Sequence, residues 1–186
     1  MKTDKRFITT EKEIYEAFAK ALNEKEYDKI TIEDILKYSN ISRSTFYKHY
    51  KNKNEILTSL TNHIFSHVLS HSLSEENTHD FSKSNIFEYT HLITHVLYHL
   101  HDEKFLIKAI ILNGCTDNFY EQIKKLVEPI AKIIISNQLV KNKEIPNELF
   151  IKSICNDFVI IIDYWFKNDC KESPEIMSKY FFELIK

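Results

Sequence analysis

Residues 31–57 read TIEDILKYSNISRSTFYKHYKNKNEIL, and this stretch decides the fold of the N-terminal part of the chain. Thr31 and Ser42 each stand just before a short segment with helical apolar spacing, where a hydroxyl side chain caps the first turn of a helix. Asn40 lies between the two segments, and asparagine tolerates positive φ better than most residues. Two helices of about eight and seven residues, joined by a turn of about three, predict a helix-turn-helix.

A longer helix precedes this pair. Thr10 and Glu13 have the spacing of a capping box, which predicts a helix from Thr10 to about Asn23. Its apolar residues recur at intervals of three and four, so one face of the helix packs inward. The N-terminal domain is therefore expected to hold three helices within residues 1–53.

The rest of the chain, residues 54–186, predicts a second helical domain. Residues 74–84 and 141–146 have no apolar period and are expected to be loops. Pro129 predicts a bend in the seventh helix, and Ser173 followed by Pro174 predicts the start of the ninth. The six expected helices span about 54–73, 85–101, 103–112, 118–139, 147–167 and 174–185.

The composition supports an all-α chain of nine helices in two domains and argues against an enzyme. A single glycine among 186 residues excludes a Rossmann fingerprint or a Walker A loop. No paired carboxylates or nucleophile–base pattern is visible, so we expect no catalysis and no cofactor. Three cysteines without CxxC spacing favour a reducing compartment. Neither a signal peptide nor a membrane span is apparent, so the expected location is the cytoplasm.

The basic charge is concentrated near the N-terminus. Residues 1–53 hold 12 Lys and Arg against 9 Asp and Glu, whereas residues 54–186 hold 13 against 18. Residues 42–53, SRSTFYKHYKNK, contain four Lys or Arg and no acid. A helix with such an outer face suits the major groove of DNA. A solvated basic turn on a helical interaction protein is the alternative.

The whole motif resembles the DNA-binding signature of the TetR/AcrR family of bacterial transcriptional repressors. The shared positions are Thr31, Ile35, Ile41, Ser42, Thr45, Phe46, Tyr47, Tyr50, Lys53 and Leu57. Ser39 and Asn40 depart from the family pattern, but they concern the packing of the turn. The ending SPEIMSKYFFELI, with Trp165 before it, is more weakly similar to regulators of dihydroxyacetone kinase operons.

This resemblance implies a TetR-like architecture and a ligand-responsive repressor that binds a palindromic operator as a homodimer. Thr31, Tyr47 and Lys53 are expected at phosphates, and Arg43 is suited to guanine. The full set of expected DNA contacts is Thr31, Ser42, Arg43, Ser44, Thr45, Tyr47, Lys48, His49 and Lys53.

The second domain is expected to form the dimer, because residues 147–167 are apolar around most of the helix and need cover on two sides. The expected interface comes from the last two helices: Phe158, Ile161, Ile162, Trp165, Met177, Tyr180, Phe181 and Leu184. An apolar pocket for an unidentified small-molecule effector is expected from Tyr89, Leu92, His95, Tyr98, Phe105, Leu112, Phe119 and Phe158.

Two histidine ladders leave a different regulator open. His63, His67 and His71 are spaced by four residues, as are His91, His95 and His99. Imidazoles at that spacing share a helix face, which suits Zn²⁺ or Ni²⁺ and also titration near neutral pH. A metal- or pH-sensing regulator is therefore the alternative, and hydrogen-bonding flank residues are the simpler interpretation.

Overall fold

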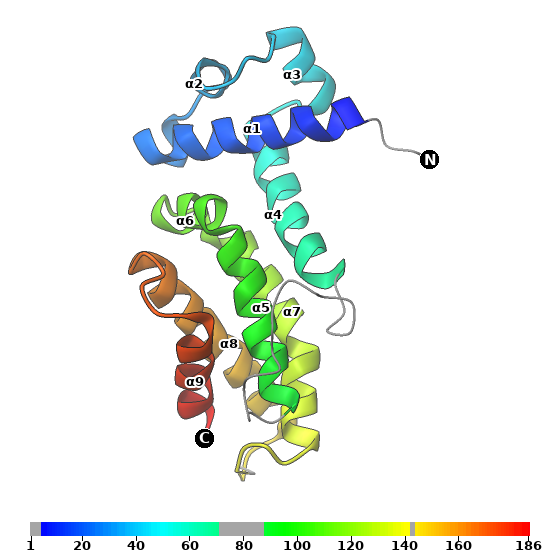
Figure 1. Ribbon diagram of the computed structural model, residues 1–186, viewed down its shortest axis with the longest axis vertical. Helices are drawn as coiled ribbons and strands as arrows, with labels where there is room; N and C mark the ends of the chain where they lie inside the picture. The colour runs from blue at the N-terminus through cyan, green and yellow to red at the C-terminus, as the bar shows by residue number, and fades with distance from the viewer. Residues whose placement is uncertain (1–4, 71–87, 142–143) are drawn as a thin grey trace.

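The computed structural model describes residues 5–70, 88–141 and 144–186 (Figure 1). Its regular elements within these ranges are all helical, as the sequence predicts. They are α1 (Lys5–Glu24), the 3₁₀ turn η1 (Tyr27–Lys29), α2 (Ile32–Lys37), α3 (Arg43–His49), α4 (Lys53–Ser70), α5 (Glu88–Asp102), α6 (Lys104–Leu112), α7 (Thr116–Ser136), α8 (Asn147–Lys167) and α9 (Pro174–Ile185).

The predicted caps are confirmed at three helices. Thr31 and Asp34 form a reciprocal capping box at α2. The Ser42 hydroxyl accepts from the backbone N–H of Thr45 at α3, and Ser173 caps α9. Each cap satisfies a backbone donor that the first helical turn leaves without a partner.

The first helix begins earlier than predicted. It starts at Lys5, and Thr10 lies inside it, with its hydroxyl donating to the carbonyl of Arg6 at 2.9 Å. A hydroxyl that bonds to the carbonyl four residues back is a mid-helix side chain and not a cap. The capping-box pattern at Thr10 was therefore a false start signal. The predicted loop at 74–84 lies outside the described residues.

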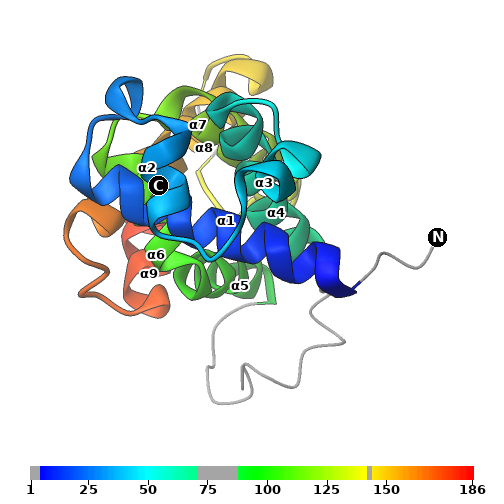
Figure 2. The ribbon, with the colours of Figure 1, turned by 90° about the horizontal axis from the view of Figure 1, so that it is seen from above.

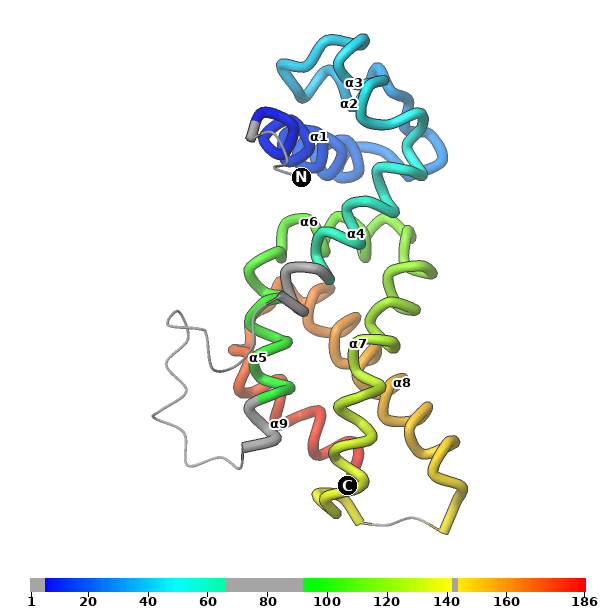
Figure 3. The backbone as a smooth tube through the Cα atoms, turned by 90° about the vertical axis from the view of Figure 1, so that its right-hand side faces the viewer, coloured from blue at the N-terminus to red at the C-terminus, as the bar shows by residue number. Residues whose placement is uncertain are grey.

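The three N-terminal helices form a layer above a helical body (Figure 1). Figure 2, seen from above, shows this layer lying over the ends of the body helices. The helix α4 descends from the layer into the body (Figure 3), where it packs on α5 and α7, while α1 packs on α6. The predicted domain boundary at residue 53 thus falls at the start of the continuous helix α4.

Each layer has an aromatic core. Phe18 and Phe46 are fully buried in the upper layer. In the body, Trp165 is fully buried, and its indole N–H donates to the carbonyl of Glu172 at 2.8 Å. Phe158 packs edge-on against Phe181, joining α8 to α9. Burying large rings with their polar atoms satisfied gives the body a stable core.

Candidate nucleic-acid interface

The turn between α2 and α3 is held by a hydrogen bond from α1. A Glu13 carboxylate oxygen accepts from the backbone N–H of Asn40 at 2.7 Å. Below the turn, Phe46 of α3 is fully buried. One face of α3 is therefore anchored in the core, and the opposite face is left for other contacts.

The exposed face of α3 carries several predicted DNA contacts. The side chains of Ser42, Arg43, Ser44, Tyr47 and Lys48 are exposed at or beside this helix. The Ser42 hydroxyl also lies 3.0 Å from that of Ser44 and accepts a hydrogen bond from the backbone N–H of Thr45. Ser42 therefore caps α3. The helix thus presents a basic and hydroxyl-rich surface without an acid of its own.

Arg43 is held in place in the free protein. Its Nη1 donates to Oε1 of Glu33 at 2.6 Å, and its guanidinium lies 5.8 Å from the centre of the Tyr47 ring. A hydrogen bond to Tyr47 and the negative charge of Glu33 raise the pKa of the Arg43 guanidinium. Glu33 was missed by the sequence analysis because it belongs to α2, ten residues away from its partner.

Thr31 is enclosed by its own cap. Its hydroxyl donates to Oδ2 of Asp34 at 2.8 Å, and its backbone N–H donates to the same oxygen at 2.9 Å. The ammonium of Lys25 also bonds to Asp34, and these contacts hold the pKa of the Asp34 carboxyl well below its usual range. The hydroxyl of Thr31, a predicted DNA contact, therefore already makes hydrogen bonds within α2.

His49, at the end of α3, is stacked on the first turn of α1. The rings of Phe7 and His49 are 4.1 Å apart between centroids, with an angle of 24° between their planes. The His49 Nδ1 atom is buried and has no hydrogen-bond partner among the residues that the structure describes. The stack therefore fixes the orientation of the imidazole, a contact that the sequence analysis did not anticipate because it expected residues 1–9 to precede the helix.

Tyr50 joins three helices through its hydroxyl. Its oxygen lies 3.1 Å from the hydroxyls of both Tyr15 and Ser59, and it donates to the Glu11 carboxylate at 3.0 Å. Burial raises the pKa of Tyr50 above its ordinary value. This cluster ties the end of α3 to α1 and α4.

Lys53 is placed differently from the prediction of a phosphate contact. Its ammonium donates to the carbonyls of Tyr27, Asp28 and Ile30 at 2.6, 3.0 and 3.1 Å. It also lies over the Tyr27 ring. An ammonium has three donors, so all of them are used inside the protein. The structure therefore places Lys53 as a link between η1 and α4.

The predicted effector residues differ in exposure within the described part of the chain. Phe105 and Leu112 of α6 are 46% and 49% exposed. Phe119 is buried beside Phe65 of α4. The remaining predicted residues are buried His95 and Phe158, half-buried Leu92 and Tyr98, and Tyr89, whose side chain lies outside the described residues.

An open groove of about 770 Å³ lies between α7 and α8. Charged residues line it, including Lys124, Glu128 and Lys152, while Ile151 and buried Cys155 contribute apolar surface. Burial raises the pKa of the Cys155 thiol to about 11, so the thiol is protonated at neutral pH. None of the predicted effector residues lines this groove.

Most of the predicted dimer residues are buried inside a single chain. Phe158, Ile161, Ile162, Trp165, Met177 and Phe181 are at most 5% exposed, so they cannot form a surface for a second copy. Only Tyr180 and Leu184 of that set are exposed. The exposed apolar side chains of the last two helices are instead Leu149, Ile160, Tyr164, Ile176, Tyr180 and Leu184. Periodicity could not separate the two faces, because α8 is apolar on both.

The histidine ladders are not brought together as metal ligands in the described part of the chain. No group of three or more His, Cys, Asp or Glu side chains there is arranged to hold a metal ion. The His63 ring packs against Tyr15, and His95 lies edge-on to buried His99. His71 and the side chains of His67 and His91 lie outside the described residues.

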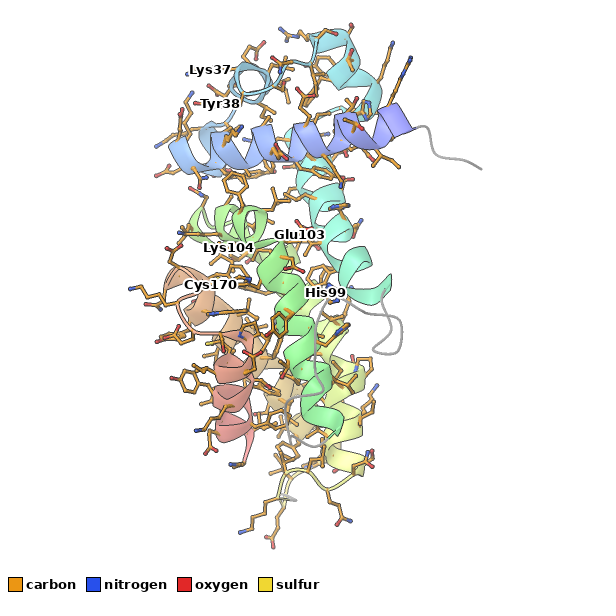
Figure 4. The ribbon with its side chains drawn as sticks, in the orientation of Figure 1. Lys37, Tyr38, His99, Glu103, Lys104 and Cys170 are labelled. Atoms are coloured by element: carbon orange, nitrogen blue, oxygen red, sulfur yellow. The ribbon has the colours of Figure 1, made fainter. Side chains whose placement is uncertain are left out.

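Figure 4 shows the side chains of the body, with several residues near the α5–α6 junction and the α8–α9 connection labelled. Glu103 and Lys104 lie where α5 passes into α6, and Cys170 lies in the α8–α9 connection, on the opposite side of the molecule from α4. Cys170 and Asp169 both have positive φ, at 50° and 62°.

None of the helices in the described ranges is long and apolar enough to cross a membrane.

Comparison with known families matches both parts of the chain. The model described as bacterial regulatory proteins of the tetR family matches residues 14–60. A second model, the transcriptional regulator C-terminal region of the same group, matches residues 87–186, which is more than half of the chain.

Individual relatives agree with these matches. An uncharacterised HTH-type transcriptional regulator, YxbF of Bacillus subtilis (strain 168), is 47% identical over 58 residues. That segment is 31% of this chain and 15% of the relative, so the chain matches only a small part of that protein's length.

Two solved structures share the fold. A TetR transcriptional regulator from Streptococcus agalactiae 2603V superposes with a TM-score of 0.68 at 23% identity, over 98% of this chain and 97% of its own. The dihydroxyacetone kinase operon activator DhaS superposes with a TM-score of 0.61 at 18% identity, over 96% and 94%. At sequence identities this low, the superpositions show that the fold is shared and nothing more.

Proposed function

The chain belongs to the tetR family of bacterial regulatory proteins, which are DNA-binding transcriptional regulators, and on that premise we propose that it is a ligand-responsive repressor. It binds a palindromic operator as a homodimer, with α3 in the major groove. A small-molecule effector bound in the helical body lowers its affinity for the operator.

One observation carries the DNA-binding part of the proposal, namely the two-sided character of α3. Phe46 anchors the inner face in the core, while Arg43, Tyr47 and Lys48 are exposed on the outer face. A short helix held rigidly from below and basic on its outer face suits docking in a groove. Arg43 offers paired N–H donors for guanine, and Ser44 and Thr45 complete the base-facing set.

Phosphate contacts are assigned to the neighbouring exposed groups. Tyr47 and Lys48 supply a hydroxyl and a cation, and His49 supplies an imidazole fixed by Phe7. Because Lys53 and Thr31 already bond within the protein, we assign them the task of holding α2 and α4 in position. Thr31 and Ser42 keep their roles as helix caps.

Dimerisation is proposed through the exposed apolar stripes of α8 and α9. Ile160 and Tyr164 lie one turn apart on α8, and Ile176, Tyr180 and Leu184 repeat every four residues on α9. Because α8 and α9 pack against each other, the two stripes belong to neighbouring helices. Apolar stripes of this kind are typical of surfaces that pair with another subunit.

The effector is proposed to bind near α5, where polar side chains are buried among apolar ones. Thr94, His95 and His99 are each at most 7% exposed, next to the fully buried Leu97. A few polar groups set among apolar walls are typical of small-molecule sites. The effector must prefer the conformation with weak DNA affinity, since equal affinity for both would shift nothing.

Selection of duplexes from a randomised DNA library by the full chain tests the proposal. We expect the recovered sequences to contain two inverted half-sites, and Arg43→Ala to weaken their binding. Analytical ultracentrifugation of the same protein should show a dimer. Recovery of no common sequence, together with a monomer, would refute the proposal.

A further inference from the structure

Glu33 is an acid of α2 that lies beside the exposed basic side chains of α3. Its carboxylate bonds to Nη1 of Arg43 at 2.6 Å, and both side chains are 62% exposed. Residues 42–53 contain no acid. A carboxylate beside the reading helix repels DNA phosphates, so its presence there lowers affinity for any duplex.

The ion pair adds little to the stability of the fold. Exposed pairs of this kind contribute on the order of 0–1 kcal/mol. Helix α2 is already capped by Thr31 and Asp34, and α3 by Ser42. The contact between Glu33 and Arg43 therefore has its main consequence for the position of the guanidinium.

The geometry of arginine links this contact to base recognition. A guanidinium has five N–H donors in a planar fork. Nη1 is directed to Glu33, and the guanidinium also makes a hydrogen bond to Tyr47, whose ring centre lies 5.8 Å away. These two contacts leave the other N–H donors of the fork for a base. Two parallel donors on one edge match the O6 and N7 acceptors of guanine.

We propose that Glu33 is a specificity-determining positioning residue, which holds Arg43 so that it pairs with guanine and not with the DNA backbone. When Arg43 contacts guanine, it keeps its bond to Glu33, and the carboxylate stays neutralised. When Arg43 turns to a phosphate, it leaves Glu33 unpaired beside the backbone. The pair thus weakens binding to unrelated DNA more than binding to the operator. This inference rests on the proposed operator binding by α3.

The test compares Glu33→Gln with the wild type in the full-length protein. The probes are a duplex recovered by the wild type from a randomised library and a random-sequence duplex of equal length. Glu26→Gln is the matched control, because Glu26 is an exposed acid of the same domain that pairs with Lys29 and not with α3. Arg43→Ala, alone and combined with Glu33→Gln, completes a double-mutant cycle.

We expect Glu33→Gln to tighten binding to the random duplex about three- to tenfold while binding to the recovered duplex stays level or weakens, so that the ratio of affinities falls about tenfold. Glu26→Gln should leave the ratio unchanged. In the Arg43→Ala background, Glu33→Gln should no longer alter the ratio.

Two results would overturn the inference in distinguishable ways. If Glu33→Gln tightens both duplexes equally, as Glu26→Gln is expected to do, Glu33 acts only as a negative charge, and operator binding by α3 stands. If the wild type shows no preference for any recovered duplex, operator binding itself fails, and the role of Glu33 fails with it.

Discussion

The upper layer, formed by α1 to α3, and the helical body differ in how their surfaces are determined by the sequence. In the upper layer, the short helix α3 has a single fully buried side chain, Phe46, while Arg43 and Tyr47 are exposed. In the body, α8 is apolar around most of its circumference, so either face could be buried. For a short capped helix, the sequence therefore predicts which side chains are exposed. For a long apolar helix, the sequence predicts the helix but not which of its faces is buried.

The largest expected effect contrasts two adjacent residues of α8. Ile161 is buried, so Ile161→Glu would place a charge without a partner in the core. We expect a loss of about 3–5 kcal/mol in the free energy of unfolding, or failure to fold, because an unpaired buried charge is strongly destabilising. Urea unfolding followed by circular dichroism measures it. An unchanged unfolding midpoint would show that Ile161 does not lie in the core.

The neighbouring substitution Ile160→Glu should act on assembly and not on folding. Ile160 is 58% exposed in the single chain, so a charge there remains hydrated in the monomer but opposes burial against a second copy. We expect a monomer by analytical ultracentrifugation, with a helical content by circular dichroism close to that of the wild type. A dimer that survives this change would remove the α8 stripe from the interface.

The difference between Ile160 and Ile161 also shows which features of the structure could be predicted from the sequence. The bounds of α8 and α9, and the caps at Thr31, Ser42 and Ser173, followed from local patterns and are confirmed. The inward and outward faces of α8 did not, because burial depends on which helices pack beside it. The contacts of Glu33, Phe7 and Lys53 also could not be predicted, because each joins segments that only the tertiary fold brings together.

A middle-sized effect is expected at the hydroxyl cluster that joins the layer to α4. Tyr50→Phe removes the hydroxyl that bonds to Glu11 and lies beside Tyr15 and Ser59. We expect a loss of about 1–3 kcal/mol in the free energy of unfolding, because buried Tyr15 and half-buried Glu11 and Ser59 each lose a partner. Thermal unfolding of the two proteins at neutral pH measures the difference.

The same residue predicts a dependence on alkaline pH. Burial raises the pKa of Tyr50 in the folded protein, so the unfolded chain loses this proton first, near pH 10. The contribution of Tyr50 to the free energy of unfolding is therefore fully present below pH 10. It falls as the pH rises above that value, because the folded state then binds more protons than the unfolded state. Tyr50→Phe should make that fall shallower. An identical slope in both proteins would show that Tyr50 ionises equally in both states.

The smallest effect separates two exposed apolar residues at the start of α1. Phe7→Ala removes the ring stacked on His49 and should weaken binding to all duplexes a few-fold, since a phosphate contact loses its fixed geometry. Ile8→Ala is the matched control, because Ile8 is equally exposed at 42%. The slope of log affinity against log salt should fall by up to about one for Phe7→Ala. Equal effects of the two variants would contradict a role for the stack.

The central claim, that α3 reads DNA from a two-fold dimer, is tested most directly by footprinting wild type and Arg43→Ala on the recovered operator. We expect two protected half-sites whose centres are about 34–36 Å apart, one helical turn of DNA. Arg43→Ala should relax the preference for one base at the same position in each half-site, at a cost of about 1–3 kcal/mol. A single unpaired half-site, or an unchanged base preference in Arg43→Ala, would contradict the account.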